Sequence, residues 1–313
     1  MNEWGKTRKP FVFLIDFAFQ HPILLQGDAV EGGLLWKTPR QQNFSRSDLP
    51  AMPVVWEVKP VDFSRYREAF RYVTGQIHAG NSYLLNLTMP SEVSCNLTPG
   101  ELFFQSQAPY QVYLKDHFLC FSPEIFVRIE NGKILSFPMK GTIEADLPDA
   151  AEILMNDRKE TAEHATIVDL IRNDLSVVAD DVRVNRFRYI DRVRTNRSDL
   201  LQMSSEISGR LPSDYRGHLG DIFSKLLPAG SICGAPKQKT LDIIRKAERY
   251  ERGYYTGVFG VFDGNSVDSC VLIRYLEPDG RKYIYKSGGG ITHLSECEKE
   301  YQELIKKIYV PIA

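Results

Sequence analysis

Apolar residues recur with two different periods along this chain, and the change of period predicts where helices give way to strands. Between Val61 and His78 they follow the three- and four-residue spacing of a helix. The apolar positions in this helix are Phe63, Tyr66, Phe70, Val73 and Ile77. Gly80 and Asn81 follow and are expected to end it. A strand is predicted next, within residues 82–90.

Much of the remaining chain consists of short segments typical of β-strands. These segments fall within residues 111–122, 125–139, 187–194, 201–210, 257–278 and 281–290. The dipeptides Asn131-Gly132, Asp263-Gly264 and Asp279-Gly280 indicate tight turns between antiparallel strands. Because strands and helices come in blocks and do not alternate strictly, we expect an α+β protein, with largely antiparallel sheets and helices outside them.

The first 55 residues have a different character. An apolar stretch from Phe11 to Phe19 predicts an edge strand, and the polar, proline-containing sequence after it predicts a loop. The apolar stretch is short, includes Asp16 and lacks a cleavage pattern, so it indicates neither a signal peptide nor a membrane span. We therefore expect a cytoplasmic protein.

Composition excludes several classes of protein. The 313 residues are 43% hydrophobic, which is enough for a large core in one big domain or two. Lys and Arg total 39 against 40 Asp and Glu, so there is no charge excess of the kind that binds nucleic acid or an anionic membrane. The five cysteines are widely spaced and form no C-x-x-C pair, which favours reduced, structural thiols.

Two predicted helices each carry a pair of glutamates one turn apart. Glu160 and Glu163 form the first pair, and Glu300 and Glu303 the second. Residues three apart share a helix face. If the two faces meet beside the glycine run 288–290, the four carboxylates would suit Mg²⁺, which prefers oxygen ligands and an anionic group of a substrate. Alternatively, each pair belongs to a solvated helix surface.

Three further segments carry chemical groups. Glu124 follows a turn in SPEIFVR, and Lys140 lies between Pro138 and Gly141 in FPMKGT, a segment expected to be tight and irregular. In GSICGAPK a helix begins with free N–H groups that attract anions. Neither a Walker sequence nor G-x-G-x-x-G occurs, so nucleotide binding is not supported.

In their order along the chain, these segments resemble the chorismate-utilising enzymes. That family includes anthranilate synthase component I, aminodeoxychorismate synthase component I, isochorismate synthase and salicylate synthase. The matching segments are SPE, P-x-K-G-T, AEH with VDLIRNDL, GSICGAPK, YYTGVFG, the strand at Arg274, SGGGIT and EYQE. The resemblance runs from about Gly80 to Lys307. It implies two packed, largely antiparallel sheets flanked by helices, in α/β/β/α layers.

The resemblance also implies roles for particular residues. Glu163 and Glu303 resemble Mg²⁺ ligands, with Glu160 and Glu300 beside them, and Glu124 matches a general acid that protonates the departing C4 hydroxyl of chorismate. Arg274 resembles the arginine that binds a substrate carboxylate, unless it only pairs with an acid on a neighbouring strand. The remaining substrate-binding positions would be Thr142, Ser231, Tyr255, Gly289, Gly290 and Lys307.

Two positions discriminate among the family's reactions. Members that add water to chorismate carry a lysine base where this chain has Leu84, and leucine cannot activate water. Anthranilate synthases usually have alanine where this chain has Lys140, whereas aminodeoxychorismate synthases have lysine. A neutral lysine amine can attack C2 of chorismate before ammonia enters at C4. The alternative is that Lys140 only pairs with a substrate carboxylate as a cation.

We therefore expect an aminodeoxychorismate synthase component I that converts chorismate and ammonia to 4-amino-4-deoxychorismate, on the way to 4-aminobenzoate and folate. Anthranilate formation is the first alternative, and a non-catalytic chorismate sensor is the second. None of the cysteine contexts resembles a glutaminase nucleophile, so we expect a separate glutamine amidotransferase partner. The whole chain, 1–313, is predicted as one catalytic domain, with a shortened N-terminal segment (1–55) and a core (56–313).

Overall fold

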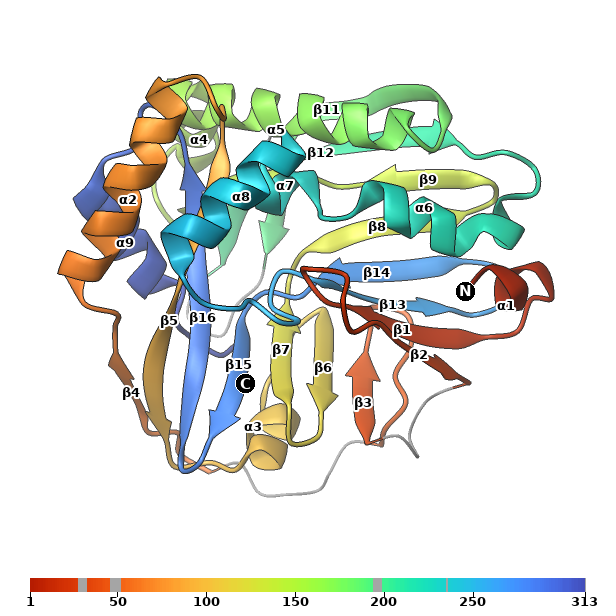
Figure 1. Ribbon diagram of the computed structural model, residues 1–313, viewed down its shortest axis with the longest axis horizontal. Coiled ribbons are helices and arrows are strands. Elements are labelled where there is room, and N and C mark those ends of the chain that lie inside the picture. The colour runs from red at the N-terminus through yellow and green to blue at the C-terminus, as the bar shows by residue number, and fades with distance from the viewer. Residues whose placement is uncertain (28–32, 46–51, 194–198, 235, 313) are drawn as a thin grey trace.

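The computed structural model describes residues 1–27, 33–45, 52–193, 199–234 and 236–312. Within them, two antiparallel sheets pack against each other (Figure 1). The larger sheet comprises β1 (Phe11–Ile15), β2 (Ile23–Gln26), β8 (Ile125–Glu130), β9 (Lys133–Ser136), β10 (Met139–Glu144), β11 (Asp180–Val193), β12 (Leu200–Arg210), β13 (Val258–Phe262) and β14 (Val267–Val271). The smaller comprises β3 (Leu34–Lys37), β4 (Trp56–Lys59), β5 (Leu85–Cys95), β6 (Tyr110–Leu114), β7 (Phe118–Ser122), β15 (Tyr275–Asp279) and β16 (Lys282–Ile291).

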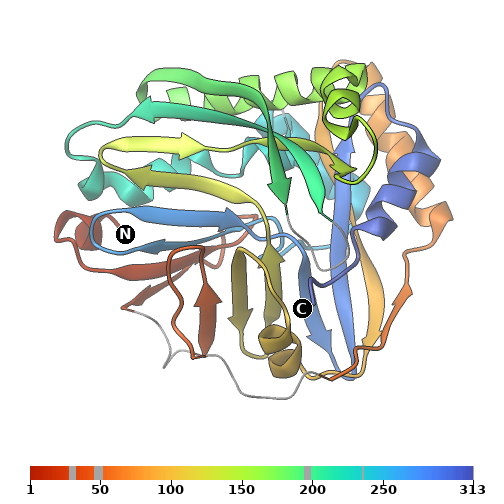
Figure 2. The ribbon, with the colours of Figure 1, turned by 180° about the vertical axis from the view of Figure 1, so that it is seen from behind.

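Helices cover the outer faces of the two sheets. They are α1 (Asn2–Lys6), α2 (Phe63–His78), α3 (Pro99–Gln105), α4 (Ala150–Asn156), α5 (Arg158–Ser176), α6 (Leu219–Leu226), α7 (Gly230–Cys233), α8 (Lys237–Glu248) and α9 (Cys297–Lys306), with a 3₁₀ turn η2 (Tyr215–His218). Helices α2, α8 and α9 lie against β5 and β16, at the left of Figure 1. Helix α5 packs on the larger sheet, where the long hairpin β11–β12 runs along the top of the molecule (Figure 2).

The central strands β1, β13 and β14 are buried on both faces because the larger sheet lies between helices and the other sheet. In β1, Phe11 and Phe13 pack among the helices of the larger sheet, whereas Val12 and Leu14 pack between the two sheets. Gly260 is opposite Phe13, and a Cβ there would lie 2.2 Å from the Phe13 ring. This α/β/β/α layering confirms the predicted α+β fold and the predicted antiparallel sheets.

One fold prediction was wrong. The strand in the first 55 residues is not an edge strand, because β1 lies between β13 and β2 and all five of its residues are buried. A short apolar run fits either position, and only long-range pairing decides between them. The helix predicted between Val61 and His78 and the turns at Asn131-Gly132, Asp263-Gly264 and Asp279-Gly280 are confirmed. The division at residue 55 stays a prediction.

No helix of the described residues has both the length and the apolar character needed to cross a membrane.

A buried ion pair fixes β5 against helix α8. Arg252 Nη2 lies 2.6 Å from Glu248 Oε1, and the two side chains are 2% and 1% exposed. Arg252 also donates to the carbonyl of Asn86 at 2.7 Å, and Glu248 accepts from the backbone N–H of Thr88 at 2.8 Å. The backbone of Asn86 and Thr88 is therefore held on the edge of β5 that faces away from β16.

We predict that Glu248→Ala lowers the free energy of unfolding by about 3–5 kcal/mol, since it leaves a buried guanidinium uncompensated. Urea denaturation followed by circular dichroism measures the loss. Glu68→Ala is the matched control, because Glu68 pairs with Arg249 where the two side chains are 55% and 63% exposed. That change should cost less than about 1 kcal/mol. Equal losses in the two variants would contradict the prediction.

Candidate active site

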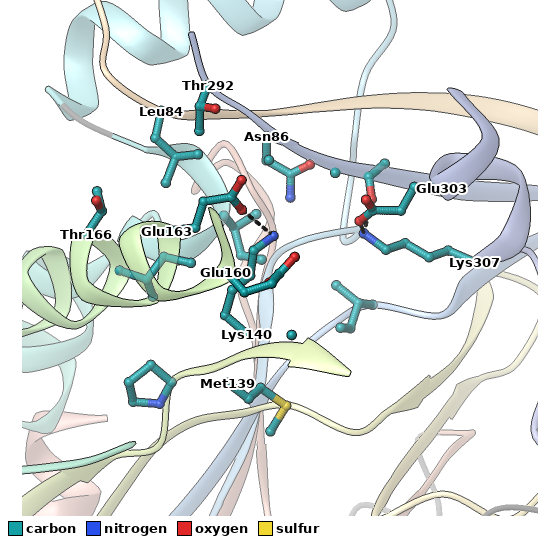
Figure 3. Close-up of a pocket in the computed structure, with 18 of the residues that line it drawn as sticks. Leu84, Asn86, Met139, Lys140, Glu160, Glu163, Thr166, Thr292, Glu303 and Lys307 are labelled. Carbon is teal, nitrogen blue, oxygen red and sulfur yellow. Dashed lines mark hydrogen bonds and ion pairs between the residues drawn. The ribbon is translucent and has the colours of Figure 1, made fainter. Parts of the chain in front are cut away.

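A cavity of about 900 Å³ opens where the two sheets and helices α5 and α9 meet (Figure 3). Its walls come from segments far apart in sequence: β5, β10, α5, the connection before β15, the end of β16, and α9. Most of the predicted site residues line it: Glu124, Lys140, Thr142, Glu160, Glu163, Tyr255, Arg274, Gly289, Gly290, Glu303 and Lys307.

Helix α5 directs one glutamate pair at the cavity. The Asp157 side chain caps the helix and accepts from the backbone N–H of Glu160 at 2.9 Å, which fixes the first turn. Glu160, Glu163 and Ile167 then recur on the face that lines the cavity. The predicted convergence of these two glutamates on the site therefore follows from the cap and the helical spacing.

Helix α9 brings the second pair to the opposite wall. Glu303 lines the cavity, and Glu300 is only 5% exposed. A Cβ on Gly289 would lie 3.5 Å from Glu303 Oε1 and 3.6 Å from Glu300 Oε2. Glycine at this position therefore leaves open the space in front of both carboxylates.

The glycine run belongs to a strand, as predicted for the segment 281–290. Gly288, Gly289 and Gly290 belong to β16 and are opposite Thr88, Leu87 and Asn86 of β5. The N–H of Thr88 and the carbonyl of Asn86 bond to Glu248 and Arg252, so these β5 residues turn their backbone groups away from β16.

Alternation along an antiparallel ladder then places the backbone groups of Gly289 within the sheet. The backbone groups of Gly288 and Gly290 point to the opposite side of β16. On that side β15 pairs with β16 only up to Lys286, so it does not reach these two glycines. The carbonyl of Gly288 accordingly accepts from Lys307 Nζ at 3.0 Å. The N–H donors available to a ligand are therefore those of Gly288 and Gly290, which corrects the prediction for Gly289.

Lys140 lies on β10, where the register with β12 shifts between Met139 and Thr142. Gly141 follows with φ +82°, and a Cβ there would lie 3.1 Å from Glu160 Oε2. This irregularity brings the strand close to α5, and Lys140 Nζ lies 2.8 Å from Glu163 Oε2. Burial alone would lower the pKa of Lys140, but Glu163, Glu160 and Glu303 outweigh burial and raise it above its usual value.

Lys307 follows α9 and pairs with Glu303, the second glutamate predicted to bind the metal. Its Nζ lies 2.6 Å from Glu303 Oε1. Burial lowers the pKa of Lys307, and Arg274 and Lys140 add to this effect, while Glu303 opposes it. Each of the two glutamates predicted to hold a metal is thus bridged to a lysine.

Arg274 lies in the connection between β14 and β15 with φ +53°, an uncommon conformation for a residue with a side chain. The guanidinium lies over the ring of Tyr309, 5.0 Å from its centroid. Tyr255, 3% exposed, lines the same part of the cavity. Tyr255 therefore lies beside Arg274 on the cavity wall, where both were predicted to bind substrate. Arg274 forms no ion pair within the described part of the chain.

Several buried polar atoms around the cavity lack hydrogen-bond partners among the described residues. They are Arg274 Nε, Asn86 Oδ1 and Ser287 Oγ. Such atoms are few in native proteins, and their clustering here indicates that a polar ligand belongs to this wall. Asn86 was not predicted. Its position two residues after Leu84, on the same face of the strand, is the signal that points to it.

The remaining predicted residues are placed as follows. Glu124 precedes β8, and its backbone is held by Ser122 Oγ at 3.1 Å and by the N–H of Val271 at 3.1 Å. Thr142 is opposite Gln202 on β12, and both line the cavity. Ser231 belongs to helix α7, but its side chain falls outside the described residues.

Two titratable residues of α5 have structural partners. Asp174 pairs with Lys237 at 2.9 Å and so ties α5 to the start of α8. His164 is fully buried away from the cavity, with Nε2 2.7 Å from Ser205 Oγ. Burial lowers the pKa of His164 to about 4, and Arg188 adds to the effect.

The carboxylates fit Mg²⁺ in chemistry and charge. All four donors are oxygens, and with Lys140 and Lys307 counted the group carries an excess of two negative charges (four glutamates, two lysines). Among the described residues, however, no three His, Cys, Asp or Glu side chains are already arranged to hold a metal. The lysines pair with the carboxylates that a metal would use.

Sequence comparison identifies the family. A family model described as chorismate binding enzyme matches residues 28–313. The chain belongs to this family. Membership of this family agrees with the resemblance found in the sequence motifs. It also agrees with the polar cavity, which is lined by an arginine and carboxylates.

Relatives of this chorismate-binding enzyme include proteins with different names. It is 48% identical to an uncharacterized PabA-like protein of Haemophilus influenzae, over 99% of this chain and 95% of that protein. It is 32% identical to aminodeoxychorismate synthase component 1 of Escherichia coli, over 78% of this chain and 56% of that one. It is 34% identical to anthranilate synthase component 1 of Archaeoglobus fulgidus, over 74% and 58%. The matches to the latter two cover little more than half of their length.

Solved structures of the family share the fold. Anthranilate synthase component I of Streptococcus pneumoniae matches with a TM-score of 0.68 and 26% identity, over 83% of this chain and 60% of that one. The menaquinone-specific isochorismate synthase MenF of Escherichia coli matches with a TM-score of 0.76, over 97% and 78%. At 19% identity this second likeness concerns the fold alone.

We predict that Gly289→Ala weakens chorismate binding by about ten-fold or more, because the methyl group occupies space in front of Glu300 and Glu303. Isothermal titration calorimetry measures the affinity. Gly75→Ala is the control, since a Cβ there meets nothing within 4 Å on helix α2. Unchanged affinity in Gly289→Ala, with a native circular dichroism spectrum, would contradict this geometry.

Proposed function

We propose that this chain is the chorismate-binding component of an aminodeoxychorismate synthase, which converts chorismate and ammonia to 4-amino-4-deoxychorismate. The observation that carries the proposal is the position of Lys140, whose amine projects from the β10 irregularity into the cavity, opposite Asn86 and Glu303 (Figure 3). Relatives that carry the name aminodeoxychorismate synthase component 1 support it.

In the proposed reaction, Lys140 first loses to water the ammonium proton that the surrounding glutamates stabilise, and then bonds as a neutral amine to C2 of chorismate. Both ring double bonds shift, C1=C2 to C1=C6 and C5=C6 to C4=C5, and the C4 hydroxyl leaves as water after taking a proton from Glu124. Ammonia then bonds to C4, both double bonds shift back, and the C2–N bond breaks to return the neutral lysine. The new C4 ammonium gives its proton to the Glu124 carboxylate, which restores the acid.

Other residues of the cavity hold the substrate and exclude water. The Arg274 guanidinium suits a carboxylate of chorismate, and the N–H groups of Gly288 and Gly290 suit a second anionic oxygen. Leu84 lines the wall and offers no base to a water molecule. Mg²⁺, with Glu163 and Glu303 as ligands and Glu160 and Glu300 beside them, would neutralise the ring carboxylate.

The test is a product assay. Purified protein is incubated with chorismate, an ammonium salt at raised pH and Mg²⁺, and the products are separated by chromatography. We expect 4-amino-4-deoxychorismate, and no product after chelation with EDTA. Anthranilate would support the alternative suggested by relatives named anthranilate synthase component 1. Tight chorismate binding without any product would support a sensor.

We predict that Lys140→Ala lowers ammonia-dependent turnover on the order of 10³-fold, equivalent to about 4 kcal/mol of barrier, because the covalent route is lost. Chorismate binding should remain within a few-fold of wild type, as measured by calorimetry. Mass spectrometry of wild-type protein quenched with chorismate in the absence of ammonia should find an adduct on Lys140. Wild-type turnover by Lys140→Ala would rule out the nucleophile.

We also propose that a separate glutaminase subunit supplies the ammonia. All five cysteines lie within the described residues and none is suited to glutaminase chemistry: Cys120, Cys233 and Cys270 are buried. Burial raises the pKa of each of these three thiols, which disfavours a thiolate nucleophile. Cys95 and Cys297 also have raised pKa values, through burial.

The expected outcome is that the isolated chain uses ammonium salts but not glutamine. Adding the amidotransferase subunit from the same organism should confer glutamine-dependent turnover, because ammonia released next to the cavity has a high effective concentration. The same mixture with the amidotransferase inactivated at its cysteine is the control. Glutamine-driven turnover by the purified single chain would refute the proposal.

A further inference from the structure

Both glutamates predicted to bind the metal are already paired with a cation from the chain itself. Lys140 Nζ lies 2.8 Å from Glu163 Oε2, where the side chains are 24% and 10% exposed. Lys307 Nζ lies 2.6 Å from Glu303 Oε1, with 29% and 43% exposed. The first pair is the more enclosed of the two, so water screens it less.

Lys140 is also influenced by glutamates from both helices. Figure 3 shows its amine between Glu163 on one side and Glu160 on the other, with Asn86 facing it. Glu160, Glu163 and Glu303 all act electrostatically on this one ammonium. Lys307 is directed instead toward Glu303 and the carbonyl of Gly288.

We propose that Lys140 is an exchangeable counter-ion of the metal site. Its ammonium holds Glu163 while no divalent cation is bound, and a divalent cation takes Glu163 from it, which frees the lysine to turn toward the substrate. This inference rests on the proposed function for the identity of the metal ligands. It assigns Lys140 a second duty, distinct from nucleophilic attack.

Competition between the two cations has a measurable consequence. A divalent ion that enters the cavity must break the Lys140–Glu163 pair and remain near a displaced positive charge, and both effects weaken its binding. Removing the lysine charge should therefore tighten binding of the metal in the absence of any substrate. A lysine that acted only as a nucleophile would not affect metal affinity.

The experiment is a titration of the purified protein with Mn²⁺, with free ion followed by electron paramagnetic resonance and no chorismate or ammonia present. Lys140→Met should bind Mn²⁺ at least about ten-fold more tightly than wild type. Lys299→Met is the matched control, because Lys299, in the first turn of α9, pairs with Glu296 at 2.6 Å and both side chains are exposed. That variant should bind as wild type does.

Further variants test whether the gain in Mn²⁺ affinity depends on the contact between Lys140 and Glu163. In a Glu163→Gln background, Lys140→Met should give a much smaller gain, because the contact being broken no longer exists. Lys140→Gln, which keeps a hydrogen-bond donor beside Glu163 without the charge, should behave like Lys140→Met and guards against a packing defect. Equal Mn²⁺ affinity in wild type, Lys140→Met and Lys140→Gln would overturn the proposal, and so would a gain that persists undiminished in Glu163→Gln.

The outcome can be separated from that of the product assay. If the protein makes 4-amino-4-deoxychorismate but Lys140→Met gains no Mn²⁺ affinity, the reaction stands and the counter-ion role falls. If it makes anthranilate and yet Lys140→Met binds Mn²⁺ more tightly, the proposed reaction falls and the counter-ion role stands.

Discussion

Like charge concentrated in one enclosed space is the constraint on which this site depends. Two helices from distant parts of the sequence bring four glutamates together, with Glu160, Glu163 and Glu303 lining one cavity and Glu300 buried. Like charges in such a place disfavour ionisation or must be neutralised. Lys140 and Lys307 neutralise half of the charge. The residual negative charge would attract the divalent cation that we propose, and such a cation would in turn neutralise part of an acidic substrate.

A buried ion pair holds in place the strand that forms one wall of this charged cavity. Strand β5, which follows Leu84, carries Asn86 on one wall of the cavity. The Glu248–Arg252 pair holds the backbone of β5 on the side away from β16. Because that pair is fully buried and multiply hydrogen-bonded, it fixes which backbone groups of β5 and β16 face each other. The direction of the Gly288 and Gly290 N–H groups is a consequence of this buried ion pair.

Local patterns predicted much of this protein. The spacing from Phe63 to Ile77 defined helix α2, and the glutamate spacing in α5 and α9 placed carboxylates at the site. Properties set by long-range pairing were not predictable in this way. The interior position of β1, the direction of the backbone groups of residues 288–290, and the pairing of Lys140 with Glu163 each depend on segments more than twenty residues away.

In the proposal made here, the choice of reaction depends on which wall of the cavity carries the amine. Leu84 precedes β5 and Lys140 lies on β10, and both line the same space. A lysine on the β5 side can activate water, whereas a lysine on the β10 side, beside Glu163, can itself reach the ring. If Glu163 binds the proposed metal, the freedom of Lys140 to react would be coupled to metal binding, because the two share this carboxylate. The irregularity at Gly141, which brings β10 against α5, would then be the local feature that connects metal occupancy to the proposed nucleophile.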